Sequence, residues 1–253
     1  MMRGAGKAMA KKIIAVYGSS GSYKTTTAIA LAHYISKTDP GANIILVGTD
    51  TTKPILPLIA PNEKKFKGSI GYCLSAVSFE QDILFKNMYM ATDKIGVLGY
   101  NIRENANTYP IVSSDRIDDM YTVLRQSADY TIVDCTSDIT SARLTSQAII
   151  KADNTIELIT ADLNGVVFNS SQESVLQSEQ YRYRSFIRLV SLDNRFSQDV
   201  NAVKAALGAI SGEMPCCTKA AEAFNQGTLI TNGVSDRTYN NVLKSIYKLI
   251  EED

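Results

Sequence analysis

Residues Ile13 to Ile35 read IIAVYGSSGSYKTTTAIALAHYI, and this stretch decides the fold that we expect. The apolar run Ile13 to Val16 is typical of a buried β-strand. Residues Gly18 to Thr25 are mostly small and polar, as they are in a tight turn. Apolar residues then recur with helical spacing from Thr26 to Ile35. The sequence therefore predicts a strand, a glycine- and serine-rich turn and a helix in direct succession.

This order of elements is the context in which a phosphate-binding loop (P-loop) is meaningful. Small residues let backbone N–H groups close around phosphate oxygens, and the helix N-terminus adds the positive end of its dipole. Lys24 would reach the outer phosphates of a nucleotide, and Thr25 would give its hydroxyl to Mg²⁺. A tight turn without a ligand is the alternative, but such a turn needs neither a lysine nor the hydroxyls of Thr25 and Thr26. The expected loop residues are Gly18, Ser19, Ser20, Gly21, Ser22, Tyr23, Lys24 and Thr25.

Tyr23 departs from the usual pattern of this loop, which has glycine directly before the lysine. That position often needs a backbone conformation that only glycine adopts easily. A tyrosine there predicts either backbone strain of about 1–3 kcal/mol or a reshaped loop.

The composition limits the classes of protein that this chain can belong to. Hydrophobic residues make up 45% of the 253 residues, and 26 basic residues balance 26 acidic ones, so no overall field favours nucleic acid or anionic lipid. Four cysteines without a C-x-x-C pair, and a single histidine, argue against a zinc site and a disulfide framework. We therefore expect a cytoplasmic protein. The sequence has no apolar run of about 18 residues, so we expect no membrane span.

The organisation that we expect is a mobile tail over residues 1–11, which are basic, and one P-loop domain over residues 12–253. Apolar runs alternate with helical patterns, which predicts an α/β fold with a doubly wound, mostly parallel sheet and helices on both faces. Residues 51–77 look irregular because three prolines interrupt them. The expected strands are 12–17, 43–47, 94–100, 130–133, 155–160, 186–191 and a short one before Pro215. The expected helices are 24–36, 79–89, 114–127, 141–151, 163–179, 199–207, 217–224 and 237–250.

Two aspartates stand at the ends of apolar runs, Asp50 after IILVGT and Asp134 after YTIV. Ligands of doubly wound sheets bind at the carboxyl ends of the strands. Each aspartate alone is equally well explained as a helix cap. Together with the loop they predict a magnesium–nucleotide site, with Thr25, Asp50 and Asp134 as the metal-binding residues.

The chain resembles the MinD/ParA group of deviant Walker A P-loop ATPases from about Lys12 to Ile230. GSSGSYKTTTAIALAHYI is similar to that group's loop. IILVGTDTTKP and ADYTIVDCTSDIT resemble its first and second switch segments. IIKADNTIELITADLNGV and GEMPCCTKAAEAFNQGTLI resemble later segments. Within the group, the tolerance of atypical loops makes TadZ/CpaE-like pilus-localisation proteins the favoured relatives.

The resemblance implies ATP and Mg²⁺ as ligands and gives the residues their roles. Lys24 would bind the outer phosphates, Thr25 would ligate Mg²⁺ and Thr26 would help to hold the inner phosphate. Asp50 would orient the attacking water or the metal shell, and Asp134 would hold a metal-bound water. Asn194 would read the adenine, and the segment after Pro215 would flank it. Lys24, Asp50 and Asp134 are thus the expected catalytic residues.

Three departures from the group's pattern bear on hydrolysis. Ser19 stands where the group has a signature lysine that contacts nucleotide across a sandwich dimer. Thr136 replaces the usual proline of the second switch, and Gly48 replaces the first acid of the first switch. A missing cation removes charge stabilisation of the transferring phosphoryl group. Nucleotide binding is therefore expected, and ATP hydrolysis is expected to be slow or absent.

The function that follows is an ATP-dependent switch that forms a homodimer and positions a protein complex, such as a pilus or secretion assembly. A partition ATPase that binds DNA nonspecifically is an alternative, because Arg182, Arg184 and Arg188 could contact phosphates. A solvated basic edge also explains these arginines. A scaffold that has lost turnover remains open. An electron-transfer ATPase fits poorly, because its cluster would need a cysteine where Ser137 stands. The C-terminal helix ends in acidic residues and is expected to pack on the core rather than on lipid.

Overall fold

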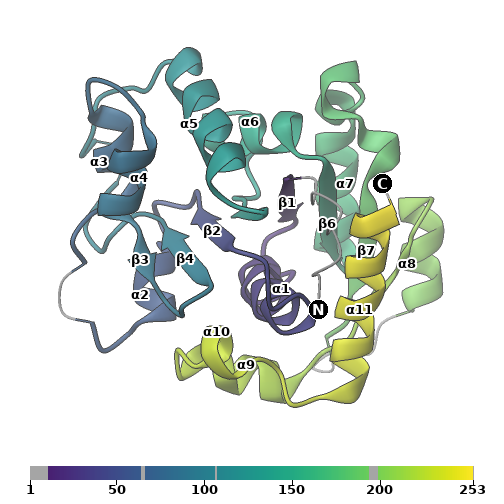
Figure 1. Cartoon of the computed structure of the whole chain (residues 1–253). Coiled ribbons are helices and arrows are strands. Elements are labelled where there is room, and N and C mark those ends of the chain that lie inside the picture. The colour runs from purple at the N-terminus through teal and green to yellow at the C-terminus, as the bar shows by residue number, and fades with distance from the viewer. Residues whose placement is uncertain (1–10, 64–65, 106, 194–198, 253) are drawn as a thin grey trace, which may run out of the picture.

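The computed structural model describes residues 11–63, 66–105, 107–193 and 199–252. Within these residues, a single eight-stranded sheet runs in the order β3-β4-β2-β5-β1-β6-β7-β8 (Figure 1). All neighbouring strands are parallel except the short β3, which is antiparallel to β4. The strands are β1 (Lys12–Gly18), β2 (Ile44–Gly48), β3 (Tyr89–Met90), β4 (Ile95–Leu98), β5 (Tyr130–Asp134), β6 (Asn154–Thr160), β7 (Ile187–Ser191) and β8 (Gly212–Met214).

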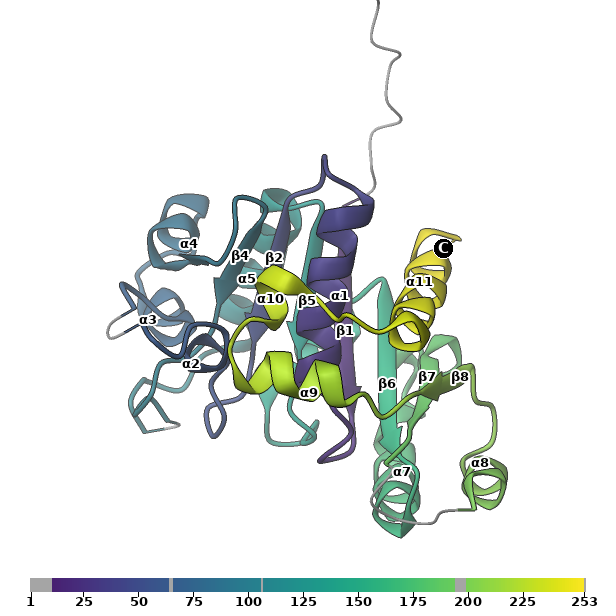
Figure 2. The same ribbon diagram turned by 90° about the horizontal axis from the view of Figure 1, so that it is seen from below.

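Helices cover both faces of the sheet, which confirms the predicted doubly wound α/β fold. The face formed by Ile14 and Val16 of β1 packs against α1, α2, α9, α10 and α11; most of these helices lie in front of the sheet in Figure 2. The face formed by Ile13 and Ala15 packs against α3 to α7. The helices are α1 (Lys24–Thr38), α2 (Ile55–Ile59), α3 (Ile70–Ser75), α4 (Gln81–Asn87), α5 (Ser114–Ser127), α6 (Arg143–Lys151), α7 (Leu163–Leu176), α8 (Val200–Leu207), α9 (Thr218–Asn225), α10 (Leu229–Asn232) and α11 (Arg237–Glu252), with short 3₁₀ turns at Glu179–Tyr181 and Tyr183–Ser185.

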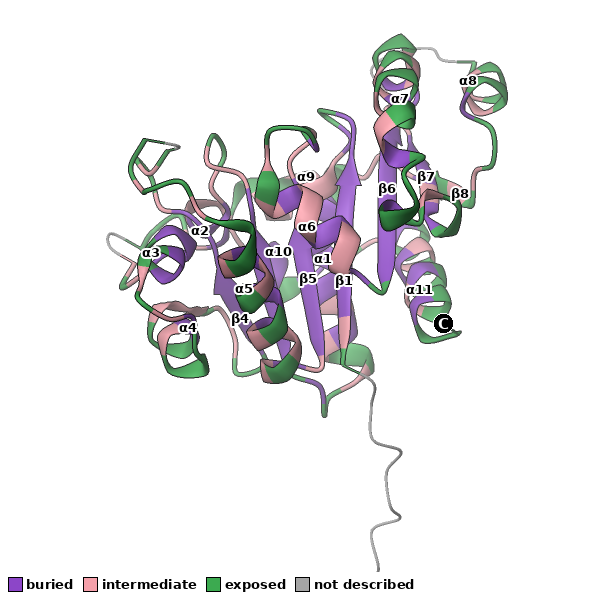
Figure 3. Ribbon diagram, turned by 90° about the horizontal axis from the view of Figure 1, so that it is seen from above, coloured by how far each residue is buried: buried purple, intermediate pink, exposed green. Residues whose placement is uncertain are grey.

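Because helices cover both faces of the sheet, the sequences of its central strands are unbroken apolar runs. Every residue of β1 after Lys12 is buried, and successive side chains point to opposite faces. Figure 3 shows the central strands as the buried layer of the molecule. The expected alternation of strands and helices is thus confirmed, whereas α2, α3, α10 and β3 were not predicted.

The C-terminal helix α11 packs on the core, as its pattern predicted. Tyr239, Leu243, Ile246 and Ile250 form its buried stripe, and the helix contacts α1 and β8. Among the described residues, no helix combines the length and the apolarity that crossing a bilayer would require. The predicted tail lies outside the described residues except for Lys11.

Candidate functional site

The predicted loop lies at the carboxyl end of β1, in the middle of the sheet and directly before α1 (Figure 1). Gly18 has a φ of 140°, and a Cβ at this position would stand 1.8 Å from the carbonyl oxygen of Leu158 in β6. No side chain fits there. Only glycine allows the backbone at the end of β1 to lie this close to the backbone of β6. Ser20 and Gly21 are exposed at the tip of the loop, while Ser19 and Ser22 are buried.

Lys24 lies at the centre of this site and joins the loop to the segment after β5, which contains Ser137. Its Nζ donates to the carbonyl oxygen of Ser19 and to Oγ of Ser137, each at 2.8 Å. Burial lowers the pKa of Lys24, while the charges of Asp134 and Asp50 oppose that shift. A cation so placed is available for an anionic ligand once it releases Ser137.

Asp134 ends β5, the strand next to β1, and contacts the first residues of α1. Its Oδ2 accepts a hydrogen bond of 2.7 Å from Oγ1 of Thr25. Burial raises the pKa of Asp134 to about 7, and the Thr25 hydroxyl and the Lys24 charge oppose the shift. Its Oδ1 is buried without a hydrogen-bond partner among the described residues. A buried carboxylate oxygen in that state calls for a cation or a hydrogen-bond donor.

Asp50 follows β2, the other neighbour of β5, so the two predicted aspartates stand at the ends of adjacent strands. Its Oδ1 accepts from the backbone N–H of Thr52 at 2.7 Å and of Lys53 at 3.1 Å. The carboxylate therefore caps its own turn in this structure, and its role towards a metal stays a prediction. Gly48, which replaces an acid of the group that the sequence resembles, has no room for a side chain, because a Cβ would lie 2.4 Å from the side chain of Ile55 in α2.

Ser19 is held away from the loop interior. Its Oγ accepts from the backbone N–H of Thr160 at 2.9 Å and lies 3.3 Å from Oγ1 of that residue. The side chain is buried, with only 2% of its surface exposed. Lys24 contacts the carbonyl oxygen of Ser19, while the hydroxyl of Ser19 is engaged with Thr160 at the end of β6.

Tyr23 adopts a left-handed conformation, with φ 64° and ψ 27°. Of the two predicted outcomes, backbone strain or a reshaped loop, the structure shows the first. Tyr23 has a backbone conformation that glycine adopts freely and that is strained for tyrosine. For a residue with a Cβ this conformation costs about 1–2 kcal/mol.

A pair of substitutions separates this strain from the side-chain contacts of Tyr23. Both Tyr23→Gly and Tyr23→Ala remove the ring, but only glycine relieves the strain. We expect the glycine variant to be more stable than the alanine variant by about 1 kcal/mol, even after glycine's greater chain entropy in the unfolded state. Urea unfolding of both proteins measures the difference. An alanine variant of equal or greater stability would show that the strain is absent.

The structure locates some of the remaining predicted site residues near the loop and others not. Thr26 is buried in the first turn of α1. Pro215 follows β8, three strands away from β1, so its contact with a base stays a prediction. Asn194 lies outside the described residues. Ser137 was missed as a site residue, although its position in the segment DCTSD after β5 was a usable signal.

A hollow of about 330 Å³ opens beside the loop. It is lined by Ser19 and Ser20 of the loop, by Ser137 and Asp138 after β5, and by Asn164, Phe168 and Gln172 of α7. The tip of the loop and the segment after β5 thus border the same hollow.

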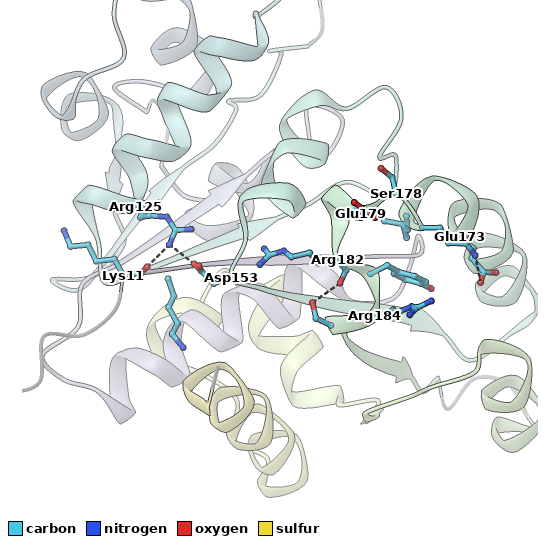
Figure 4. Close-up of a pocket in the computed structure, with 13 residues that line it drawn as sticks. Lys11, Arg125, Asp153, Glu173, Ser178, Glu179, Arg182 and Arg184 are labelled. Atoms are coloured by element: carbon cyan, nitrogen blue, oxygen red, sulfur yellow. Dashed lines mark hydrogen bonds and ion pairs between the residues drawn. The ribbon is translucent and has the colours of Figure 1, made fainter.

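A much larger hollow of about 1370 Å³ lies at the opposite end of the strands, where Lys11 precedes β1 and Asp153 precedes β6 (Figure 4). Four of the five cations that line it, all except Arg184, donate to carbonyl oxygens at the C-terminal ends of helices. Lys11 donates to the carbonyl of Gln126 in the last turn of α5, and Arg182 to that of Ala152 at the end of α6. Arg125 forms a 2.8 Å ion pair with Asp153. Helix C-termini favour such cations, so these four residues of the lining have a structural explanation.

Arg182, Arg184 and Arg188 were interpreted as phosphate contacts or as a solvated edge, and for Arg188 this interpretation is wrong. Its Nε donates to Oε2 of the fully buried Glu157 at 2.7 Å. Its guanidinium also lies 5.0 Å from the centre of the Tyr183 ring. Arg188 is therefore part of the interior between β6, β7 and α7, and of the three only Arg182 and Arg184 are exposed.

No family model matches the sequence, and no curated protein matches it. Solved structures of similar fold exist. The ParA family ATPase from Chlorobium tepidum TLS has a TM-score of 0.78 at 12% identity, over 94% of this chain and 98% of that one. The septum site-determining protein MinD from Pyrococcus horikoshii OT3, complexed with Mg-ADP, has a TM-score of 0.74 at 13% identity, over 94% and 96%.

A third similar structure is the MinC:MinD cell division protein complex from Aquifex aeolicus. It has a TM-score of 0.71 at 15% identity, over 95% of this chain and 96% of that one. The likeness covers nearly the whole of each chain, whereas the identities are low. This chain therefore has the fold of the MinD/ParA-type P-loop ATPases, as the resemblance of its motifs predicted.

Proposed function

We propose that this protein is an ATP-binding switch of the MinD/ParA type. The observation that carries the proposal is the junction of the loop with β5. Lys24 lies inside the loop, and the next residue, Thr25, is hydrogen-bonded at 2.7 Å to Asp134 at the end of the adjacent strand. A structural turn needs neither this lysine nor this hydroxyl–carboxylate pair. The nucleotide would lie on the loop N–H groups, with Lys24 on its outer phosphates.

The residues present also fit Mg²⁺. The oxygen donors of Thr25 and Asp134 are the kind that Mg²⁺ prefers, and Oδ1 of Asp134 is buried and unpaired among the described residues. Thr25 would ligate the ion, Asp134 would hold a metal-bound water, and Asp50 would join them if it left its turn. Mg²⁺ would neutralise phosphate charge, and this chain's residues would orient the nucleotide and limit access of water to it.

Substitution of Asp134 by asparagine tests this assignment. The change keeps the shape of the side chain and its acceptor for Thr25, but it removes the negative charge. We expect Mg²⁺ to tighten ATP binding strongly in the parent protein and much less in Asp134→Asn. Titration with a fluorescent ATP analogue, with and without Mg²⁺, gives both ratios. An identical Mg²⁺ response in the two proteins would contradict the role of Asp134.

The proposed role is to position a protein complex, such as a pilus or secretion assembly, from the cytoplasm. The protein would dimerise on ATP and would hydrolyse it slowly or not at all. The complex of MinD with MinC shows that a protein of this fold takes a protein partner. We favour a protein partner over DNA, because the largely buried Arg188 is held in an ion pair with Glu157 and Arg182 donates to the end of α6.

The dimer is tested by measuring the size of the purified protein in solution. We expect light scattering after gel filtration to give a monomer without nucleotide and a dimer with ATP and Mg²⁺. Lys24→Ala is the matched control and should stay monomeric under both conditions. A parent protein that binds ATP in a titration but keeps one size throughout would rule out an ATP-driven dimer.

A further inference from the structure

Thr145 of α6 connects the two loops that carry the candidate aspartates. We call residues 49–53, after β2, the first loop, and residues 136–141, after β5, the second loop. The Oγ1 of Thr145 lies 3.0 Å from Oγ1 of Thr49 and 3.1 Å from Oγ1 of Thr136. It also accepts a 3.1 Å hydrogen bond from the backbone N–H of Thr136. Thr145 is fully buried and Thr49 is 6% exposed, so water does not compete for the contact between these two hydroxyls, whereas Thr136 is half-buried.

The number of protons in this cluster fixes the direction of most of its hydrogen bonds. A threonine hydroxyl has one proton to donate and two lone pairs. Thr49 uses its proton on the carbonyl oxygen of Asp134, at 3.0 Å. A hydrogen bond between Thr49 and Thr145 then requires the hydroxyl of Thr145 as its donor, and a lone pair of Thr145 is available to the hydroxyl of Thr136.

Thr136 therefore has two acceptors for a single proton. One is Oγ1 of Thr145, and the other is the carbonyl oxygen of Asp138 at 3.1 Å. In the first arrangement the hydroxyl strengthens the link of the second loop through α6 to the first loop. In the second arrangement the hydroxyl binds within the second loop, and only the backbone N–H of Thr136 keeps that link. A hydroxyl at position 136 has this choice, which an apolar side chain there would lack.

Each loop is otherwise held by its own aspartate. Asp138 accepts from the backbone N–H of Thr140 at 2.9 Å and of Ser141 at 3.0 Å. Hydrogen bonds from Ser141 and Thr140 lower the pKa of Asp138 to about 2. Asp50 caps the first loop in the same manner. The Thr145 hydroxyl is thus a side-chain link between two separately capped loops.

We infer that Thr145 is a positioning residue that couples the two loops, so that a change in one alters the order of the other. The inference deepens the proposed function, because it rests on these loops forming the nucleotide site. Its test is run without nucleotide, and failure of ATP binding would therefore leave its outcome intact.

The experiment is a double-mutant cycle read by amide hydrogen exchange of the unliganded protein. Asp138→Ala releases the second loop. In the parent background we expect it to speed exchange of the Thr49, Thr52 and Lys53 amides about 3- to 30-fold, as for residues that share one hydrogen-bond network. In the Thr145→Val background the further change from Asp138→Ala should fall below about twofold. Thr145→Ser restores the hydroxyl and should restore the response.

Two variants keep this test decisive. Thr131→Val removes another fully buried hydroxyl, from β5, which bonds only weakly to the carbonyl of Leu124 at 3.5 Å; the response should persist in it. If Thr145→Val does not fold, Thr49→Val removes the hydroxyl through which Thr145 contacts the first loop, and it should also weaken the response of the Thr52 and Lys53 amides. An equal response of the first loop to Asp138→Ala with and without the hydroxyl of Thr145, or of Thr49 in the second design, would overturn the inference.

Discussion

ATP binding should weaken about 10- to 150-fold when Lys24 is replaced by alanine, since a charge-assisted phosphate contact is worth about 1.5–3 kcal/mol. The structure supplies the physical reason. The Lys24 ammonium is partly buried, and its 2.8 Å contacts are neutral oxygens, on Ser19 and Ser137. A phosphate that replaced them would provide the opposite charge. Titration of both proteins with a fluorescent ATP analogue measures the loss.

Two controls make this result specific to the position of the charge. Lys37→Ala removes an exposed lysine from the last turn of the same helix and should leave the affinity unchanged. Ser137→Ala removes one of the present partners of Lys24 without touching the charge, and it should not weaken binding. Equal affinities of the parent and Lys24→Ala would refute the P-loop interpretation.

The second large effect concerns turnover. We expect phosphate release at saturating ATP to be far slower than roughly one per second, the low end of typical enzyme rates. A cation that contacts the transferring phosphoryl group is worth about 10³–10⁵ in rate in related nucleotide hydrolases. Ser19 stands where the group has that cation, and its hydroxyl is engaged with Thr160 at the end of β6. The slow rate would suit a protein that persists in its ATP-bound form.

Ser19→Lys and Ser19→Ala together test the cause of slow turnover. Both variants leave the Thr160 amide without its acceptor, but only lysine adds a charge that can leave the buried position and reach the nucleotide. We expect Ser19→Lys to be faster than the parent and Ser19→Ala to show no gain. A parent rate at or above about one per second would defeat the claim. No gain in Ser19→Lys would shift the cause to the strained backbone at Tyr23.

Local sequence patterns predicted the secondary structure correctly where the elements follow one another without interruption. The β1–loop–α1 unit is such a case, because it consists of an apolar run, small residues and a helical repeat in direct succession. The helices after β2 could not be predicted in this way. Pro57 lies in the first turn of α2, where its missing N–H costs nothing. Position 71 in α3 needs glycine, because a Cβ there would lie 2.2 Å from the ring of Tyr109.

The sequence by itself determined the class of the fold, the position of the loop and the aspartates at the strand ends. These features depend on composition and spacing over a few residues. Only the tertiary structure decided the partners of the polar side chains. Ser19 meets Thr160 across 141 positions of the chain, and Thr25 meets Asp134 across 109. Arg188 is an interior residue because Glu157 stands beside it on the neighbouring strand. A buried polar atom is stable only with a partner, and strand order, which no local pattern encodes, selects that partner.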